Sequence, residues 1–244
     1  EDSADTIGYT YKTKLENWSD ITTTSFYASH VITGAGFGGM VSYSDLVEYN
    51  HGLSLRGWGR RSSLYGETED YERRFSTEID GFDYDDKYIF DEIGYNFMPS
   101  EISAAFALVQ LEKLNENINK RIQNYNYLRE KISKSENIFI PSSSENVETG
   151  WIAFPMILTN KLSSKRREFQ IFLEKSGIQT RTIFTGNILR QPVSRKFKWE
   201  SYGSFEVCDE IMKSGILLGC HNRQSQDKLE YICLKVKEAE EYLL

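Results

Sequence analysis

The sequence is poor in cysteine, histidine and proline, and it has no hydrophobic run long enough to cross a membrane. Three of its 244 residues are cysteines, and Cys208, Cys220 and Cys233 are too scattered to form a C-x-x-C pair. This spacing argues against zinc and iron–sulfur sites, and scattered thiols fit a reducing cytoplasm. The longest apolar stretches, such as ISAAFALVQL, are far below the roughly 20 residues that span a bilayer. We therefore expect a cytoplasmic protein with no metal site and no membrane span.

The chain also lacks the excess of positive charge that is typical of proteins that bind nucleic acids. Its 36 acidic residues outnumber the 29 basic ones, and the formal net charge is −7. A chain this acidic is a poor candidate for wrapping phosphate backbones, so we expect no nucleic-acid partner. With 39% hydrophobic and 27% charged residues, the composition is that of an ordinary globular protein with one large domain or two small ones.

The first half of the chain contains two helix signals among weaker patterns. Thr and aromatic residues over 9–26 predict a strand, a turn and a second strand. Ser44 or Asp45 is expected to cap a short helix. Residues 56–90 carry several glycines and no clear period, which is typical of a long irregular excursion. From about Ser100, apolar residues recur at helical spacing, and no Gly or Pro interrupts the predicted helix up to about Ser135.

The second half of the chain alternates strands and helices, which is the pattern of an α/β or α+β domain. The predicted strands cover residues 151–158, 179–184 and 216–218. The predicted helices cover residues 165–175, 205–213 and 224–244. Gly177 is expected to close the first of these helices, because glycine readily adopts the backbone conformation that ends a helix.

A histidine stands directly before a glycine-rich turn in the stretch SFYASHVITGAGFGG. His30 is one of three histidines, and four of the six residues from 34 to 39 are glycines. An imidazole can move protons at cellular pH, and a glycine turn lets a phosphate or a flat cofactor approach the backbone. A histidine satisfied by hydrogen bonds at a tight turn explains the same pattern. A nucleotide-binding P-loop does not match it.

Two other residues could contribute to binding a flat, phosphate-bearing cofactor. Asp2 could hold a protonated ring nitrogen, and Ser25 could donate its hydroxyl to a phosphate. Taken alone, Asp2 is explained as simply by a surface acid at a strand end, and Ser25 by a serine with a structural role. The residues themselves therefore leave both interpretations open.

Four stretches of sequence follow one another in the order of a known family. They are EDSAD, SFYASH with its glycine-rich sequel, DEIGYNFMPSEISAAFALVQLEKL and GIQTRTIFTGNILRQP. Together they resemble the PLP-dependent sugar aminotransferases, which have the aspartate aminotransferase fold (fold type I), over nearly the whole chain. The resemblance implies an α/β protein. Residues 1–120 would form the C-terminal part of the large PLP-binding domain, and residues 121–244 the small α/β domain. The chain would then lack the family's N-terminal part.

The main departure from this family is His30, which stands where the aminotransferases carry the lysine that binds the cofactor covalently. Imidazole cannot form a stable bond of that kind, but it retains the proton-moving task. The swap is characteristic of the family's sugar 3-dehydratases, such as those acting on GDP-4-keto-6-deoxymannose. The resemblance therefore implies PLP/PMP-dependent C3 dehydration of a nucleotide-linked 4-keto-6-deoxyhexose. Glutamate would be the amino donor, and the pathway that of dideoxysugars and lipopolysaccharide.

The same resemblance implies roles for individual residues at the cofactor. Asp2 would pair with the pyridine nitrogen and keep the ring protonated. Ser25 would bind the cofactor phosphate, and His30 would be the catalytic acid and base. Asn96 would reach the phosphate in the neighbouring subunit's site, which makes a homodimer necessary for function.

The residues implied for the substrate lie in the last of the four stretches. In the family this segment runs near the sugar-nucleotide pocket. The resemblance assigns three residues there to substrate binding: Arg181, Asn187 and Arg190.

Two further departures from the family pattern concern loops. The family's G-E-G-G becomes GAGFGG, with Phe37 where the acid would stand. The segment RGWGRRSSLYGETEDYERRF has no cysteine, so the resemblance implies the dehydratase type without an iron–sulfur cluster. Two alternatives stay open. The chain could be an aminotransferase relative in which His30 has been repurposed, or a noncatalytic fragment or regulator.

Overall fold

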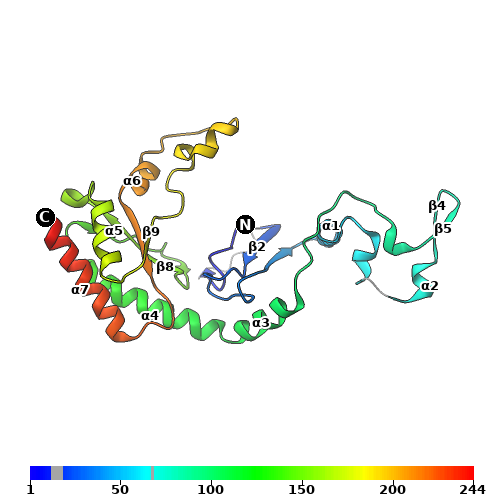
Figure 1. Ribbon diagram of the computed structural model, residues 1–244, viewed down its shortest axis with the longest axis horizontal. Coiled ribbons are helices and arrows are strands. Elements are labelled where there is room, and N and C mark those ends of the chain that lie inside the picture. The colour runs from blue at the N-terminus through cyan, green and yellow to red at the C-terminus, as the bar shows by residue number, and fades with distance from the viewer. Residues whose placement is uncertain (12–18, 67–68) are drawn as a thin grey trace. The chain divides into compact units, whose positions relative to one another are not determined.

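The computed structural model describes residues 1–11, 19–66 and 69–244, which form two compact units (Figure 1). Unit 1 contains Glu1–Ile7 and the described residues of 19–112. Unit 2 contains the described residues of 8–11 and Lys113–Leu244. Part of the strand–turn–strand predicted over 9–26 falls at 12–18, outside the described residues. The assignment of 1–120 and 121–244 to a large and a small domain stays a prediction.

Unit 1 is built from short strands and helices that follow one another along the chain. Two antiparallel hairpins, β2–β3 and β4–β5, provide its strands. Its elements are β2 (Ile21–Ser25), β3 (Gly39–Tyr43), α1 (Leu46–Arg56), α2 (Tyr71–Arg74), β4 (Thr77–Ile79), β5 (Phe82–Tyr84) and α3 (Glu101–Glu112), with 3₁₀ turns at Arg61–Tyr65 and Asp86–Tyr88.

Local sequence explains where α1 begins. The Asp45 carboxylate accepts hydrogen bonds from the backbone N–H groups of Val47 (2.9 Å) and Glu48 (3.1 Å), which satisfies donors that the helix leaves unpaired. The prediction of a capped helix here is confirmed, with Asp45 as the cap. The prediction of an irregular excursion over 56–90 is only partly right, because α2 and the β4–β5 hairpin form inside it.

The helix predicted from Ser100 to Ser135 is divided in two. α3 ends at Glu112 and α4 (Leu114–Ile132) begins after Lys113, whose φ of −95° and ψ of 1° depart from the helical values. The uninterrupted helix of the sequence prediction was therefore wrong at this residue. α3 contains no buried residue, although most of its side chains are apolar; Ile102 is 79% exposed.

Unit 2 contains an antiparallel sheet with the strand order β6-β8-β10-β9 and a separate two-stranded pair, β1–β7. Its strands are β1 (Thr10–Tyr11), β6 (Ile138–Phe139), β7 (Val147–Glu148), β8 (Ala153–Leu158), β9 (Thr180–Arg181) and β10 (Gly215–Gly219). Its helices besides α4 are α5 (Arg166–Lys175), α6 (Glu206–Ser214) and α7 (Gln226–Leu243), with 3₁₀ turns at Asn160–Leu162, Ile188–Arg190 and Pro192–Lys196.

Most of the predicted elements of unit 2 are present, but one strand is short. The strand expected over 179–184 is limited to Thr180–Arg181. Phe184 has a φ of +44°, which is outside the β region, so an extended strand cannot continue through it. The strand itself ends at Arg181, one of the predicted site residues.

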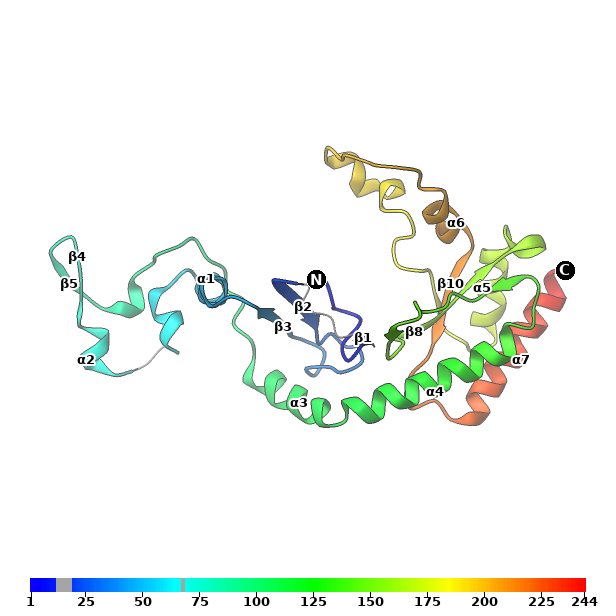
Figure 2. The same ribbon diagram turned by 180° about the vertical axis from the view of Figure 1, so that it is seen from behind.

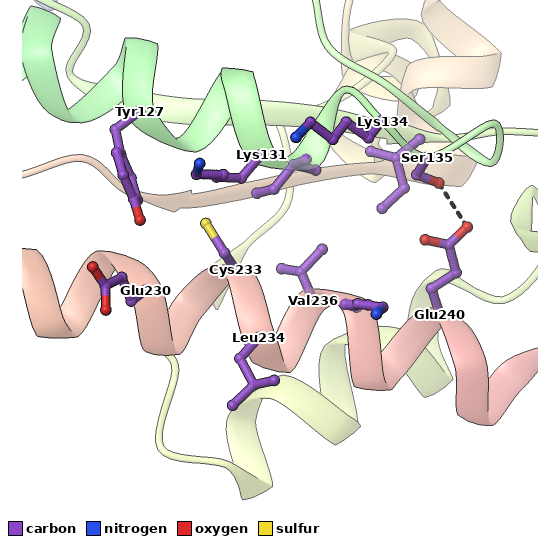
Figure 3. A pocket seen from close by; sticks show the side chains of 12 residues that line it. Tyr127, Lys131, Lys134, Ser135, Glu230, Cys233, Leu234, Val236 and Glu240 are labelled. Carbon is purple, nitrogen blue, oxygen red and sulfur yellow. Dashed lines mark hydrogen bonds between the residues drawn. The ribbon is translucent and has the colours of Figure 1, made fainter.

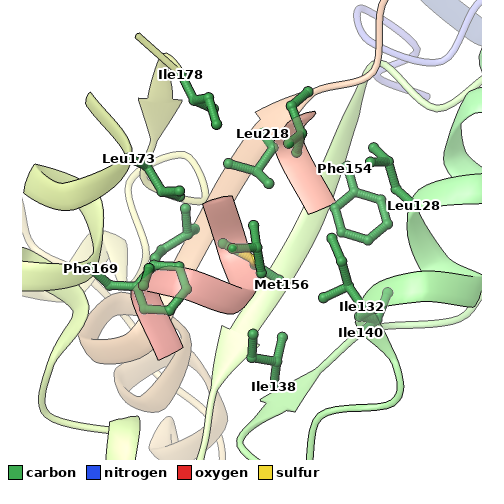
Figure 4. Close-up of a cluster of buried hydrophobic side chains, with 14 of the residues drawn as sticks. Leu128, Ile132, Ile138, Ile140, Phe154, Met156, Phe169, Leu173, Ile178 and Leu218 are labelled. Carbon is green, nitrogen blue, oxygen red and sulfur yellow. The ribbon is translucent and has the colours of Figure 1, made fainter. Parts of the chain in front are cut away.

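The hydrophobic core of unit 2 lies between the sheet and its helices (Figure 4). Phe154 and Met156 of β8 pair in register with Leu218 and Ile216 of β10, and all four are at most 1% exposed. Period-2 alternation places these side chains on one face. Leu128 and Ile132 of α4 and Phe169 and Leu173 of α5 cover them, and α7 runs beside α4 in Figure 2.

Candidate active site

The N-terminal segment of unit 1 lies alongside strand β2 and carries the first candidate residue. Ser3 N–H donates to the Thr23 carbonyl (2.8 Å) and Thr23 N–H donates to the Glu1 carbonyl (2.9 Å), so Asp2 forms a parallel bridge with Thr23. The Asp2 side chain is exposed, and its Oδ1 accepts a hydrogen bond from Ala4 N–H at 3.1 Å. Asp2 is thereby fixed two residues along β2 from Ser25.

Ser25 ends β2 opposite Gly39 and starts a tight turn. Its Oγ accepts a hydrogen bond from Tyr27 N–H at 3.3 Å, and its carbonyl oxygen lies 3.2 Å from His30 Nδ1. The His30 backbone N–H closes the turn by donating to the Tyr27 carbonyl (3.1 Å). The same six-residue segment, from Ser25 to His30, therefore carries both a hydroxyl and an imidazole.

His30 has a second polar neighbour that the sequence prediction missed. Its Nε2 lies 3.3 Å from Oδ1 of Asp5, and the side chains are 13% and 31% exposed, respectively. Val31 and Ile32, which follow His30, are buried and fix the backbone at this point. The only sequence signal for Asp5 was that it is the second aspartate of EDSAD, and it has no spacing relation to His30.

The glycine-rich turn after His30 depends on backbone conformations that favour glycine. Gly36 and Gly38 both have a φ of +97°. At Gly34, an added Cβ would lie 2.3 Å from the Phe37 carbonyl oxygen, so no side chain fits there. Phe37, which stands where the resemblance places an acid, is 74% exposed, and its side chain therefore points away from the packed part of the turn.

Asn96 lies in a segment held against the end of α1. It forms an antiparallel bridge with Gly57, and Tyr95 N–H donates to the Leu55 carbonyl at 2.7 Å. Gly59 and Gly94 meet so closely that a Cβ on Gly94 would lie 2.1 Å from the backbone nitrogen of Gly59. Asn96 is exposed. It belongs to the same unit as Asp2, Ser25 and His30.

The predicted substrate residues lie in unit 2. Arg181 is exposed, and its Nη1 donates to the Thr180 carbonyl at 2.7 Å. Arg190 and Asn187 both bind Asp209 of α6: Arg190 Nη2 donates to Oδ2 and Asn187 Nδ2 to Oδ1, each at 2.7 Å. These donors lower the pKa of Asp209 to about 2, with Arg190 the larger cause.

Both polar atoms of the Asn187 side chain form hydrogen bonds within the protein. It is 3% exposed, and its Oδ1 accepts a hydrogen bond from Leu189 N–H at 3.0 Å. Through its hydrogen bond to Asp209, Asn187 also anchors residues 187–190 to α6. Of the predicted substrate residues, Arg181 therefore has the guanidinium most open to an anionic ligand, because Arg190 is engaged by a carboxylate.

A cavity of about 440 Å³ lies between α4 and α7 in unit 2 (Figure 3). Tyr127, Lys131, Cys233 and Glu240 are among its lining residues, and none of the predicted site residues lines it. Burial raises the pKa of Cys233 to about 11, so the thiol stays protonated at neutral pH and is a poor nucleophile. The cavity therefore offers no link to the predicted proton chemistry.

Residues 1–11, 19–66 and 69–244 contain no candidate metal centre and no candidate membrane span. No group of three or more His, Cys, Asp or Glu side chains is arranged to hold a metal ion in these ranges. No helix there is long and apolar enough to cross a bilayer.

Comparison with known proteins gives consistent matches along the whole chain. The model of the DegT/DnrJ/EryC1/StrS aminotransferase family matches residues 1–237. The lipopolysaccharide biosynthesis protein RfbH of Salmonella typhimurium (strain LT2) is 31% identical over 98% of this chain and 55% of its own length. The dTDP-4-dehydro-2,6-dideoxy-D-glucose 3-dehydratase of Saccharopolyspora spinosa is 29% identical over 98% and 52%. The chain thus spans about half the length of the curated relatives it matches.

Solved structures confirm the predicted fold. The Escherichia coli GDP-4-keto-6-deoxy-D-mannose-3-dehydratase with bound hydrated PLP superimposes with a TM-score of 0.81 at 24% identity. The superposition covers 96% of this chain and 59% of that one. The α/β fold of the type I PLP enzymes, present here over part of its length, is therefore the architecture that carries His30 and its neighbours.

Proposed function

The chain belongs to the DegT/DnrJ/EryC1/StrS aminotransferase family, and from this we propose that it takes part in the PLP/PMP-dependent removal of the C3 hydroxyl from a nucleotide-linked 4-keto-6-deoxyhexose. The observation that carries the proposal is the position of His30. An imidazole, rather than an amine, closes the turn that begins at Ser25. A 3-dehydratase is also named among the relatives that match 98% of the chain.

The polar side chains around β2 have the chemistry that a pyridoxal cofactor requires. A carboxylate at Asp2 suits a protonated pyridine nitrogen, and the hydroxyl of Ser25 suits a phosphate. The glycine turn leaves open space at Gly36, where an added Cβ would meet no atom within 4 Å. We therefore assign Asp2 and Ser25 to the cofactor. When bound, the cofactor supplies the amine that reacts with the C4 ketone and a ring that accepts electron density.

His30 supplies the proton transfers in this proposal. Its Nδ1 faces a backbone carbonyl, so Nε2 is the nitrogen left to exchange a proton. With the cofactor bound, the imidazole would take a proton from the cofactor's aminomethyl carbon and would then deliver a proton to the departing C3 hydroxyl, which leaves as water. Acid–base help of this kind accelerates a reaction by roughly 10²–10⁴-fold. Glutamate is the proposed amino donor that restores the amine after each turnover.

Substrate and partner contacts are assigned to the remaining predicted residues. Arg181 is proposed to bind the nucleotide phosphates, with Asn187 and Arg190 supporting the same segment. Asn96 is proposed to complete the site of a second subunit in a homodimer. In support, Ile93, Tyr95 and Phe97 near Asn96 are 88%, 58% and 68% exposed, which is an unusual apolar surface for a segment without a partner.

Transamination is the second candidate function, because the matched family is described by its aminotransferases. The two reactions differ in the fate of nitrogen. Native protein incubated with PLP, glutamate and a nucleotide-linked 4-keto-6-deoxyhexose should yield a 3-deoxy-4-keto sugar, which mass spectrometry detects by its lost oxygen. A product that keeps the hydroxyl and gains an amino group would support transamination instead. A product of either kind would exclude a noncatalytic role, and its absence would favour one.

A further inference from the structure

An arginine surrounded by aromatic rings lies in the segment that follows α1. The guanidinium carbon of Arg60 is 4.5 Å from the centre of the Trp58 ring. It is 5.9 Å and 5.7 Å from the ring centres of Tyr88 and Phe90, and the Arg60 backbone forms an antiparallel bridge with Phe90. Cation–π contacts of this kind hold a guanidinium in one orientation. Arg60 is therefore a cation whose position is fixed by its neighbours.

This cation has no anionic partner within the part of the chain that the structure describes. Arg60 forms no ion pair there, and its Nε is buried without a hydrogen-bond partner. Carboxylates of the same region are engaged by other cations: Asp91 by Arg61, Asp85 by Arg74 and Glu69 by Lys87. Because a buried donor without an acceptor is unfavourable, the arrangement suits a ligand that supplies the missing acceptors.

The residues next to Arg60 in the chain carry further unpaired polar atoms. Nε of Arg56 and Oγ of Ser62 are buried without hydrogen-bond partners among the described residues, and Ser62 is only 5% exposed. Trp58 has a φ of +63°, which is unusual for a bulky side chain. Native proteins satisfy most buried polar groups, and strained backbone is concentrated at functional sites. Both features therefore mark residues 56–62 as a candidate binding segment.

We propose that a cluster of four side chains binds the nucleoside diphosphate of a sugar-nucleotide substrate; its members are Trp58, Arg60, Tyr88 and Phe90. Arg60 binds a phosphate, because a guanidinium offers paired N–H donors that match phosphate oxygens. Tyr88 and Phe90 are each 57% exposed, so their rings are open to stacking, and every nucleobase has a flat face that stacks on an aromatic ring. The proposal rests on the proposed function, and the second phosphate of the diphosphate remains for Arg181.

The experiment is isothermal titration calorimetry of the full chain with two ligands. One is inorganic pyrophosphate, and the other is whichever of GDP, CDP, UDP and dTDP the unaltered chain binds most tightly. Arg60→Gln should weaken the binding of both ligands by about 10- to 100-fold, the scale of a lost hydrogen bond between charged groups. Arg60→Lys should recover part of this loss, because lysine keeps the charge but not the planar set of donors.

A second variant tests the contact to the base. Phe90→Leu should weaken binding of the nucleoside diphosphate by about 5- to 100-fold and leave pyrophosphate binding unchanged, because pyrophosphate has no base to stack. Arg73→Gln is the matched control for Arg60→Gln, since the Arg73 guanidinium also lies over an aromatic ring, 3.7 Å from the centre of Tyr65. It should change neither affinity.

The outcomes separate this inference from the proposed function. Equal nucleotide affinity in folded Arg60→Gln and in the unaltered chain would overturn the proposal, and so would no binding of any of the four nucleotides. If circular dichroism showed that Arg60→Gln does not fold, Phe90→Leu would decide, and unchanged nucleotide binding there would overturn the proposal. No sugar reacts in these titrations. Nucleotide binding that depends on Arg60, in a protein that does not dehydrate the sugar, would therefore overturn the proposed function and support this inference.

Discussion

The Nε2 atom of His30 lies 3.3 Å from Oδ1 of Asp5, although 24 residues separate them in the chain. The two aspartates of EDSAD therefore make different contacts. Oδ1 of Asp2 accepts a hydrogen bond within its own turn, while Asp5 meets the imidazole. An imidazole between a carbonyl oxygen and a carboxylate is a group prepared to move protons, and this supports a chemical role for the turn after β2.

Replacing His30 by lysine should create a covalent link to the cofactor. A lysine amine can condense with the pyridoxal phosphate aldehyde, and an imidazole cannot do so stably. His30→Lys incubated with pyridoxal phosphate should show a shifted absorbance band and, after borohydride reduction, a cofactor-bearing peptide containing residue 30. His51→Lys, at a position with a 51% exposed side chain, is the control and should show neither. Cofactor bound covalently to another lysine of the unaltered protein would count against the assignment.

The hydrogen bonds that Asp209 accepts from Asn187 and Arg190 should weaken at low pH, and the segment that carries these two residues should then be less firmly attached to α6. The folded-state pKa of about 2 lies below the usual 3.8, so the stabilisation is fully present above about pH 4 and is lost as the pH falls through 2. Trp199 reports on this segment, because its Nε1 donates to the Ser194 carbonyl at 2.7 Å. Its indole N–H signal in NMR should move between pH 4 and pH 2. In Asp209→Asn it should be altered already at neutral pH, and an identical titration in both proteins would refute the coupling.

Two glycines with similar backbone conformations should respond differently to alanine. Gly59 and Gly81 have φ values of +75° and +86°, but only at Gly59 does an added Cβ collide with backbone. Gly81→Ala should cost about 1 kcal/mol of unfolding free energy, for the left-handed conformation alone. Gly59→Ala should cost roughly 2–4 kcal/mol, because the clash with Glu92 adds to it. Urea unfolding measures both, and equal losses would show that the close approach is not required.

The core of unit 2 should depend on Phe154 far more than on an exposed phenylalanine of the same sheet. Phe154 is 0% exposed and lies 5.3 Å from the Tyr125 ring between centroids. Phe154→Ala should cost about 3–5 kcal/mol, through lost transfer energy and a new cavity. Phe139→Ala, at a position 58% exposed on β6, should cost less than about 1 kcal/mol. Similar unfolding midpoints for the two variants would contradict the observed packing.

Local patterns predicted most elements of unit 2 and the cap of α1. Strand β8 and helices α5, α6 and α7 follow from the spacing of apolar residues, which is a property of short windows of sequence. The break at Lys113 and the early end of β9 at Arg181 did not follow. Neither involves Gly or Pro, and both depend on backbone angles at single residues, Lys113 and Phe184.

The candidate site was predictable in its residue types but not in its contacts. His30, Ser25 and Asp2 were proposed from a resemblance. The structure places Ser25 at the end of β2, Asp2 beside its middle residue Thr23, and His30 in the turn that follows. The Asp5–His30 contact joins two segments that meet only because the N-terminal residues pair with β2. The engagement of Asn187 and Arg190 by Asp209 likewise required the position of α6. Long-range contacts of this kind leave no periodic trace in a single sequence.

The central claim is that His30 carries the proton transfers of C3 dehydration, and the most direct measurement compares His30→Ala with unaltered native protein. Both are supplied with PLP, glutamate and a nucleotide-linked 4-keto-6-deoxyhexose, and formation of the 3-deoxy-4-keto sugar is followed by mass spectrometry. The proposed role predicts a loss of roughly 10²–10⁴-fold in His30→Ala, while the control His51→Ala keeps the full rate. Dehydration by His30→Ala at the rate of the unaltered protein would contradict the role given to this imidazole.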